Sequence, residues 1–155
     1  MKIIVELLQK ANKTIATMES CTGGYLVNSI TNISGSSDVL KFSAVTYSNE
    51  FKIKMGVNKD IIDKYSVYSL EVAKEMSLVI SNYTNSDYGV GITGKINDID
   101  INNLFGEDNK VFVSIYDKNN NQYYTKEIKT INSSREDNKK RIVKIIKDML
   151  IKIIG

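Results

Sequence analysis

The sequence contains no histidine, no proline and no tryptophan, and it has a single cysteine among its 155 residues. Without histidine, a Ser-His-Asp triad, a Cys-His dyad and a histidine-based metal site are all excluded. Any general base would have to be a lysine, a carboxylate, a tyrosine or a polarised water. The one cysteine, Cys21, cannot form a disulfide within the chain, so we expect a reducing, cytoplasmic setting.

Long apolar runs are also missing. No stretch approaches the ~18 residues that a membrane span needs. The first residues, MKIIVE, become charged too early for a signal peptide.

The net charge of +3 is too small to indicate nucleic acid binding by itself. From residue 129 onward there are eight basic and three acidic residues. We interpret this end as the solvated face of a helix rather than a binding patch, and expect neither a membrane nor a nucleic acid partner.

Hydrophobic periodicity predicts alternating helices and strands. We expect helices over residues 2–12 and 25–30 and helices that begin near residues 58, 69 and 133. Strands are expected over residues 14–18, 39–48, 88–93, 110–116 and 122–129, the last two as a hairpin. This order predicts an α/β domain, with helices on both faces of a mixed, mostly parallel sheet of about five strands. The length fits one domain, residues 1–155.

Residues 19–24, ESCTGG, lie at the turn between the first predicted strand and the helix after it. Gly23 and Gly24 allow a tight bend and the close approach of a ligand. Free N–H groups at a helix start favour an anion or a developing oxyanion. Ser20 could therefore be a nucleophile, although on spacing alone a helix cap is the stronger interpretation. Cys21 could be a small buried hydrophobe or a thiol of low pKa.

Tyr47 and Lys52 follow the second predicted strand, and Thr93-Gly94 ends the third. Ligands of open α/β sheets bind beyond the carboxyl ends of parallel strands, so these residues could converge with Ser20. A neutral, desolvated lysine could take the serine proton, and a tyrosine could relay it or orient the lysine. Singly, Tyr47 and Lys52 could be ordinary solvated residues. Together the set suits acyl transfer at an amide.

Several segments, in this order, resemble the CinA C-terminal domain family. They are ESCTGG at 19–24, GSS at 35–37, VTYSNEFK at 45–52, GV at 56–57, SLEVAKEM at 69–76 and GITG at 91–94. The similarity extends from about residue 14 to residue 94, and weaker agreement continues to the end. ESCTGG together with the downstream YSNExK pattern is specific. The resemblance implies a three-layer α/β/α fold with a mixed sheet, usually in a homodimer.

The family resemblance also implies an activity. Members of this kind are nicotinamide-nucleotide amidases, which convert nicotinamide mononucleotide to nicotinate mononucleotide and ammonia. The implied catalytic residues are Ser20, Tyr47 and Lys52, and neither a cofactor nor a metal is implied. The expected substrate-binding residues share the turn after the first strand or the end of the third; they are Glu19, Thr22, Gly23, Gly24, Thr93 and Gly94.

The segment after Gly94 departs from the family pattern. The family continues with a Gly/Pro-rich loop that helps form the nucleotide pocket, whereas residues 95–108 hold Lys95 and four carboxylates. These carboxylates would repel a phosphate unless Lys95 compensates.

Longer family members carry a further N-terminal domain, so we expect a stand-alone domain here. Three hypotheses stay open: an amidase for nicotinamide mononucleotide, an amidase for another small amide, and a non-catalytic binding or assembly module.

Overall fold

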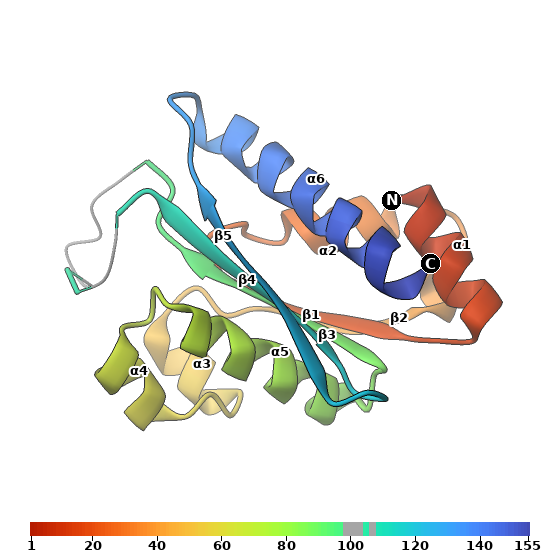
Figure 1. Ribbon diagram of the computed structural model, residues 1–155, viewed down its shortest axis with the longest axis horizontal. Helices are drawn as coiled ribbons and strands as arrows, with labels where there is room; N and C mark the ends of the chain where they lie inside the picture. Colours follow the sequence, from red (N-terminus) through yellow and green to blue (C-terminus); the bar gives the residue numbers. More distant parts are fainter. Residues whose placement is uncertain (98–103, 106–107) are drawn as a thin grey trace.

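The computed structural model describes residues 1–97, 104–105 and 108–155. Its centre is a five-stranded sheet with the order β2-β1-β3-β4-β5 (Figure 1). The strands are β1 (Ile15–Glu19), β2 (Leu40–Val45), β3 (Tyr88–Gly94), β4 (Lys110–Asp117) and β5 (Gln122–Lys129). Their number and order along the chain confirm the predicted set of strands.

The sheet is mixed. β1 pairs in parallel with β2 and β3, whereas β4 runs antiparallel to both β3 and β5. The predicted hairpin and mixed character are therefore confirmed, but the expectation of a mostly parallel sheet is wrong for the pairings, of which only half are parallel. The short turn between β4 and β5 can join only antiparallel strands, and β4 also runs antiparallel to its other neighbour, β3.

Helices cover both faces of the sheet (Figure 1). One face carries α1 (Lys2–Ala11), α2 (Tyr25–Thr31) and α6 (Arg135–Ile154), and the other carries α3 (Asn49–Lys54), α4 (Lys59–Tyr65) and α5 (Leu70–Thr84). A short 3₁₀ helix, η1 (Ser36–Asp38), precedes β2. The three-layer α/β/α architecture is thus confirmed. Within the described ranges, none of the helices combines the length and the apolar character that a bilayer span requires.

The region between β2 and α4 differs from the sequence-based prediction. The predicted strand over residues 39–48 ends at Val45, and the unpredicted helix α3 follows after Ser48. The Ser48 hydroxyl caps α3 by accepting a hydrogen bond from the backbone N–H of Phe51. A helix of six residues is too short to show a clear 3.6-residue period, so its stability depends on the tertiary structure around it.

Close packing of α5 against β3 depends on two glycines. A Cβ atom on Gly89 would lie 2.0 Å from the carbonyl oxygen of Ser77, and one on Gly91 would lie 2.3 Å from that of Ala73. Any larger residue would therefore push the helix away from the sheet. On α5, the helical spacing of Val72, Met76, Val79, Ile80 and Tyr83 predicts one core-facing side. Val72, Met76 and Ile80 are buried as predicted, but Tyr83 at the end of the helix is exposed.

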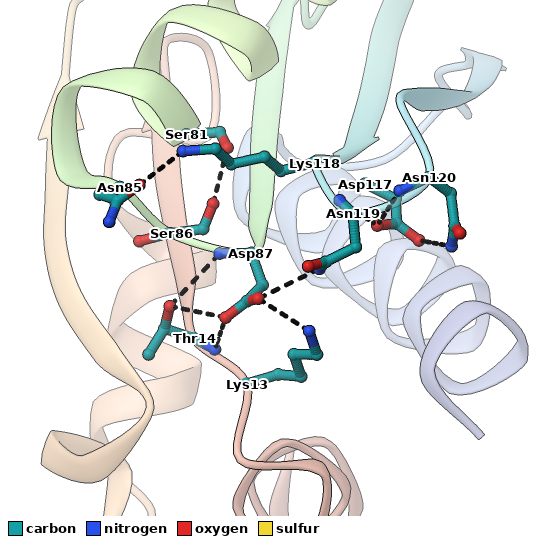
Figure 2. Close-up of polar contacts among 10 residues, drawn as sticks. All are labelled: Lys13, Thr14, Ser81, Asn85, Ser86, Asp87, Asp117, Lys118, Asn119 and Asn120. Carbon is teal, nitrogen blue, oxygen red and sulfur yellow. Dashed lines mark hydrogen bonds and ion pairs between the residues drawn. The ribbon is translucent and has the colours of Figure 1, made fainter.

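The edge of the sheet at the start of β1 and β3 is held together by Asp87 (Figure 2). Its carboxylate accepts hydrogen bonds from the Thr14 backbone N–H at 2.9 Å, from the Lys13 ammonium at 3.0 Å and from the Asn119 amide at 3.1 Å. Burial raises the pKa of Asp87, but these hydrogen bonds outweigh it and hold the pKa at about 2, below its ordinary value of 3.8. This carboxylate therefore stabilises the fold in its ionised form.

Asp87→Asn is expected to lower the free energy of unfolding by about 1–3 kcal/mol at neutral pH, because charge-assisted hydrogen bonds are lost. A carboxylate with a lowered native pKa stabilises the fold above its unfolded value of 3.8 and loses that effect as pH falls toward about 2. Urea unfolding at several acidic pH values should show this loss in the parent protein and not in the variant. Asp148→Asn, an exposed control on α6, should leave the acid profile unchanged.

Candidate active site

The contact at the centre of the candidate site joins Ser20 and Lys52. Lys52 Nζ lies 3.0 Å from Ser20 Oγ and donates a 2.7 Å hydrogen bond to the carbonyl oxygen of Thr46. Lys52 is 1% exposed and Ser20 is 6% exposed. Helix α3, which the sequence did not predict, carries the lysine from the opposite layer to the end of β1. A hydroxyl and a buried amine are therefore held at hydrogen-bond distance at the carboxyl edge of the sheet.

Glu19 caps helix α2 instead of Ser20. Its fully buried carboxylate accepts hydrogen bonds from the backbone N–H groups of Leu26 and Val27 and from the Thr22 hydroxyl at 2.7 Å. A carboxylate at a helix N-terminus is favoured by the helix dipole. The capping interpretation of Ser20 is therefore wrong, and its hydroxyl is left for Lys52. Glu19 and Thr22, expected as substrate-binding residues, bond to each other and shape the turn.

The two glycines of the turn have the backbone conformation that the sequence suggested. Gly23 has a φ of 61° and Gly24 a φ of 91°, values that favour glycine. The Gly23 N–H donates to the Ser20 carbonyl at 2.9 Å, so it is already engaged. Within the described part of the chain, the N–H groups of Thr22 and Gly24 have no hydrogen-bond partner. Both groups are therefore available to bind an oxyanion.

Cys21, next to Ser20, is a buried thiol with little reactivity. Burial raises its pKa to about 12, although the positive charges of Lys52 and Arg135 lower it. A thiol with this pKa is almost entirely protonated at neutral pH, and only the thiolate is a good nucleophile. Of the two interpretations that the sequence left open, the small buried hydrophobe is therefore the one that fits.

The end of β3 lies beside the end of β1. Met18 pairs with Gly91, and continuing this parallel register places Thr93 next to Ser20. The Thr93 hydroxyl donates a 2.8 Å hydrogen bond to the Val67 carbonyl, and Thr93 is fully buried. Thr93 and Gly94 are thus at the predicted edge, where Thr93 anchors the segment before α5.

Lys95, just beyond β3, is buried and neutralised. Its ammonium lies 2.8 Å from an Asp108 carboxylate oxygen and 4.9 Å from the centre of the Tyr68 ring. One of the four carboxylates of the acidic segment is therefore compensated by this lysine. The other three, Asp98, Asp100 and Glu107, lie outside the described residues.

Tyr47 is not assembled with the other predicted catalytic residues. Its side chain is 66% exposed, and within the described residues no hydrogen bond joins its hydroxyl to Ser20 or to Lys52. The residue follows the end of β2, which is the outer strand of the sheet. Tyr47 is therefore close to Lys52 in sequence, while its side chain lies exposed to solvent.

Helix α6 brings two cations that the sequence analysis did not assign to the site. Lys139 Nζ lies 3.4 Å from the position that a Cβ atom of Gly23 would occupy. Arg135 donates a hydrogen bond to the Ile96 carbonyl, and its charge acts on the Cys21 thiol. The two are four residues apart and so share one face of α6. This spacing was the signal in the sequence, but the whole basic end was interpreted as solvated.

The arrangement as a whole combines a hydroxyl, a buried amine, two unpaired backbone N–H groups and nearby positive charge. A nucleophile with an adjacent base and oxyanion donors is the set that acyl transfer needs. In the parts of the chain that the structure describes, no three Cys, Asp or Glu side chains are grouped closely enough to hold a metal ion.

Solved structures share this fold. A CinA superfamily protein from Klebsiella pneumoniae superposes with a TM-score of 0.89 over 99% of this chain and 94% of that chain, at 19% sequence identity. The competence/damage inducible protein CihA from Agrobacterium tumefaciens gives a TM-score of 0.84 over 98% of this chain and 96% of that chain, at 23% identity. At this level of identity the likeness concerns the fold.

Sequence comparison gives the family. A competence-damage inducible protein from Thermoanaerobacter sp. (strain X514) is 44% identical over 94 residues, 60% of this chain. A CinA-like protein from Prochlorococcus marinus (strain MIT 9215) is 43% identical over 93 residues, 59% of this chain. The matched region spans 23% and 22% of the length of these two relatives. The profile of the CinA C-terminal domain matches residues 1–154, and the chain belongs to this family.

Proposed function

We propose that this protein is an amidase that hydrolyses the carboxamide of nicotinamide mononucleotide to nicotinate mononucleotide and ammonia. The observation that carries the proposal is the 3.0 Å contact between Ser20 Oγ and Lys52 Nζ in a chain without histidine. Membership of the CinA C-terminal domain family agrees with it, because the resemblance implies this substrate. Amide hydrolysis needs a strong nucleophile, and Lys52 is the group placed to activate the serine.

The proposed chemistry runs through the deprotonated amine of Lys52, because an ammonium cannot accept the serine proton. Ser20 Oγ attacks the carboxamide carbon while Lys52 Nζ takes the hydroxyl proton. The N–H groups of Thr22 and Gly24 stabilise the oxyanion, and Lys52 returns its proton to the nitrogen that leaves as ammonia. Water, deprotonated by Lys52 in turn, then attacks the ester carbon; the bond to Ser20 Oγ breaks, Lys52 returns the proton to Oγ, and the carboxylate product leaves.

Positive charge beside the turn supports a phosphorylated substrate. Arg135 and Lys139 project from α6 toward residues 21–23, and Lys95 offsets part of the acidic segment by pairing with Asp108. Guanidinium and ammonium groups form strong, charge-assisted hydrogen bonds to phosphate. We therefore assign the substrate phosphate to the α6 side of the site, beside Arg135 and Lys139.

A second candidate is an amidase for a small amide without phosphate. The observation that favours it is the replacement of the family's Gly/Pro-rich loop by residues 95–108, with one lysine against four carboxylates. Both candidates use Ser20 and Lys52 in the same way and differ only in what binds beside them.

An ammonia-release assay with purified protein separates these candidates. Nicotinamide mononucleotide, nicotinamide riboside and nicotinamide are supplied at equal concentration. A kcat/KM that is highest for the mononucleotide supports the proposed function, and one that is equal or higher for the phosphate-free amides supports the second candidate. Absence of ammonia from all three, in a folded protein, would contradict both and leave a non-catalytic module.

Lys139→Gln is expected to raise KM for nicotinamide mononucleotide by about tenfold and to change kcat little, because a charged contact to phosphate is lost in substrate and transition state alike. For nicotinamide riboside, which has no phosphate, kcat/KM should stay the same in the variant. The control Lys140→Gln has the same charge change on the neighbouring face of α6. A similar loss for the riboside would contradict the assignment of Lys139 to the phosphate.

A further inference from the structure

A groove lies between α2 and α6, which run side by side on one face of the sheet (Figure 1). The groove has a volume of about 340 Å³, within the range of small-molecule sites. Lys140, Lys144 and Lys147 line it from α6. No Asp or Glu side chain is among its lining residues.

The three lysines form one stripe. Their spacing of four and three residues places them on a single face of α6, where like charges at such spacing destabilise a helix. Lys140 has an ion pair with Glu136 at 2.9 Å, in which both side chains are more than half exposed, so this pair is weak. Within the described residues, Lys144 and Lys147 have no carboxylate at ion-pair distance. The groove therefore concentrates positive charge that the fold itself does not compensate.

The α2 side of the groove adds neutral hydrogen-bond donors and an apolar surface. Tyr25 and Asn32 contribute a phenol hydroxyl and a carboxamide, and neither has a side-chain hydrogen bond within the described residues. Ile33 and Val143 supply apolar contact area. Cations, neutral donors and a small apolar area together suit a phosphorylated organic molecule better than a purely apolar ligand.

The groove is separate from the Ser20 site. Lys139, which approaches Gly23, immediately precedes Lys140, and consecutive residues of an α-helix point about 100° apart. The two basic faces of α6 therefore serve different surfaces.

We propose that the groove between α2 and α6 binds the diphosphate group of a small molecule. Lys144 and Lys147 contact the two phosphates, Lys140 adds charge at the rim, and Tyr25 and Asn32 donate hydrogen bonds. Two neighbouring unpaired ammonium groups match two linked phosphates better than one isolated anion, because both charges are then compensated by one ligand. This binding does not depend on the amidase proposal.

The test is calorimetric titration with inorganic pyrophosphate at about 150 mM salt, where surface electrostatics are screened to physiological strength. Lys144→Gln combined with Lys147→Gln should weaken binding by about tenfold or more, since two charge-assisted contacts are lost. Removing two like charges from one stripe should not harm folding. Lys41→Gln combined with Lys126→Gln, two exposed lysines on β2 and β5, is the control with the same net charge and should bind like the parent.

Titrations with other phosphate ligands identify the preferred ligand, and a titration of Lys139→Gln shows which face of α6 binds it. Binding of a nucleoside diphosphate more tightly than pyrophosphate would show that the organic part occupies the apolar area, and equal binding would show that the diphosphate alone is recognised. Lys139→Gln should leave pyrophosphate affinity unchanged, because it belongs to the other face of α6. The proposal is overturned by an absence of pyrophosphate binding, by equal binding of monophosphate, or by equal weakening in the two double variants.

Discussion

Replacing Ser20 by alanine is expected to lower kcat for ammonia release by about 10³-fold or more, as loss of a catalytic nucleophile does in other hydrolases. The hydroxyl lies at the end of β1, within hydrogen-bond distance of a buried lysine and beside two unpaired backbone N–H groups. At the same turn, the Cys21 thiol stays protonated and the Thr22 hydroxyl donates to Glu19, so Ser20 is the group best placed to attack the carboxamide. Fold stability should change little, because the Ser20 hydroxyl does not cap α2. The measurement is steady-state ammonia release with nicotinamide mononucleotide.

Cys21→Ala is the matched control for this prediction. The thiol is the neighbouring side chain with a nucleophilic atom, and its pKa of about 12 keeps it protonated. We expect the variant to retain most of the parent kcat. An inactive Cys21→Ala together with an active Ser20→Ala would show that the thiol, and not the hydroxyl, attacks the substrate.

Lys52→Met and Lys52→Arg are both expected to lower kcat by about 10³-fold or more. Methionine fills a similar volume without a basic nitrogen, and arginine keeps the charge but stays protonated, so neither can take the serine proton. In the parent protein kcat/KM should rise with pH, because only the deprotonated amine acts as a base. The readouts are the pH profile of the parent and the single-pH rates of both variants. A fully active Lys52→Arg protein would contradict the assigned role.

Lys54→Met controls for a general effect on helix α3. Lys54 lies two residues after Lys52 on the same helix. Its side chain is exposed, and its ammonium pairs with the Glu50 carboxylate at 2.5 Å. It should keep parent activity, since a surface ion pair contributes little. Urea unfolding of Lys52→Met separates a catalytic loss from an unfolded protein. An inactive variant whose unfolding transition matches the parent supports the role as base.

Much of the fold could be predicted because residues that favour helix starts and apolar residues at regular spacing mark most of its helices and strands. Helices α4, α5 and α6 begin close to the predicted residues 58, 69 and 133, where the side chains of Asn58, Ser69 and Ser134 cap them. Val72, Met76 and Ile80 recur at helical spacing and are buried. The errors occur where the signal is short or ambiguous. Helix α3 has six residues, and Tyr83 continues an apolar pattern past the point where the core covers it.

The structure brings together only part of the set of site residues that the family pattern marked. Ser20 and Lys52 are 32 residues apart and meet, whereas Tyr47, within the same motif as Lys52, stays exposed. Glu19, which stays a predicted substrate-binding residue, accepts hydrogen bonds at the start of α2. Arg135 and Lys139 were treated as solvated and lie beside the turn.

The sequence by itself determined the tight glycine turn after β1, the exclusion of histidine chemistry and the alternation of helices and strands. These properties depend on residue type and on neighbours within a few positions, so local backbone preference and hydrophobic period are enough. Only the tertiary structure decided that Lys52, rather than another lysine, contacts Ser20 and that one face of α6 approaches Gly23. Such distances depend on sheet register and on how the helical layers pack across it, and no local pattern in the chain encodes them.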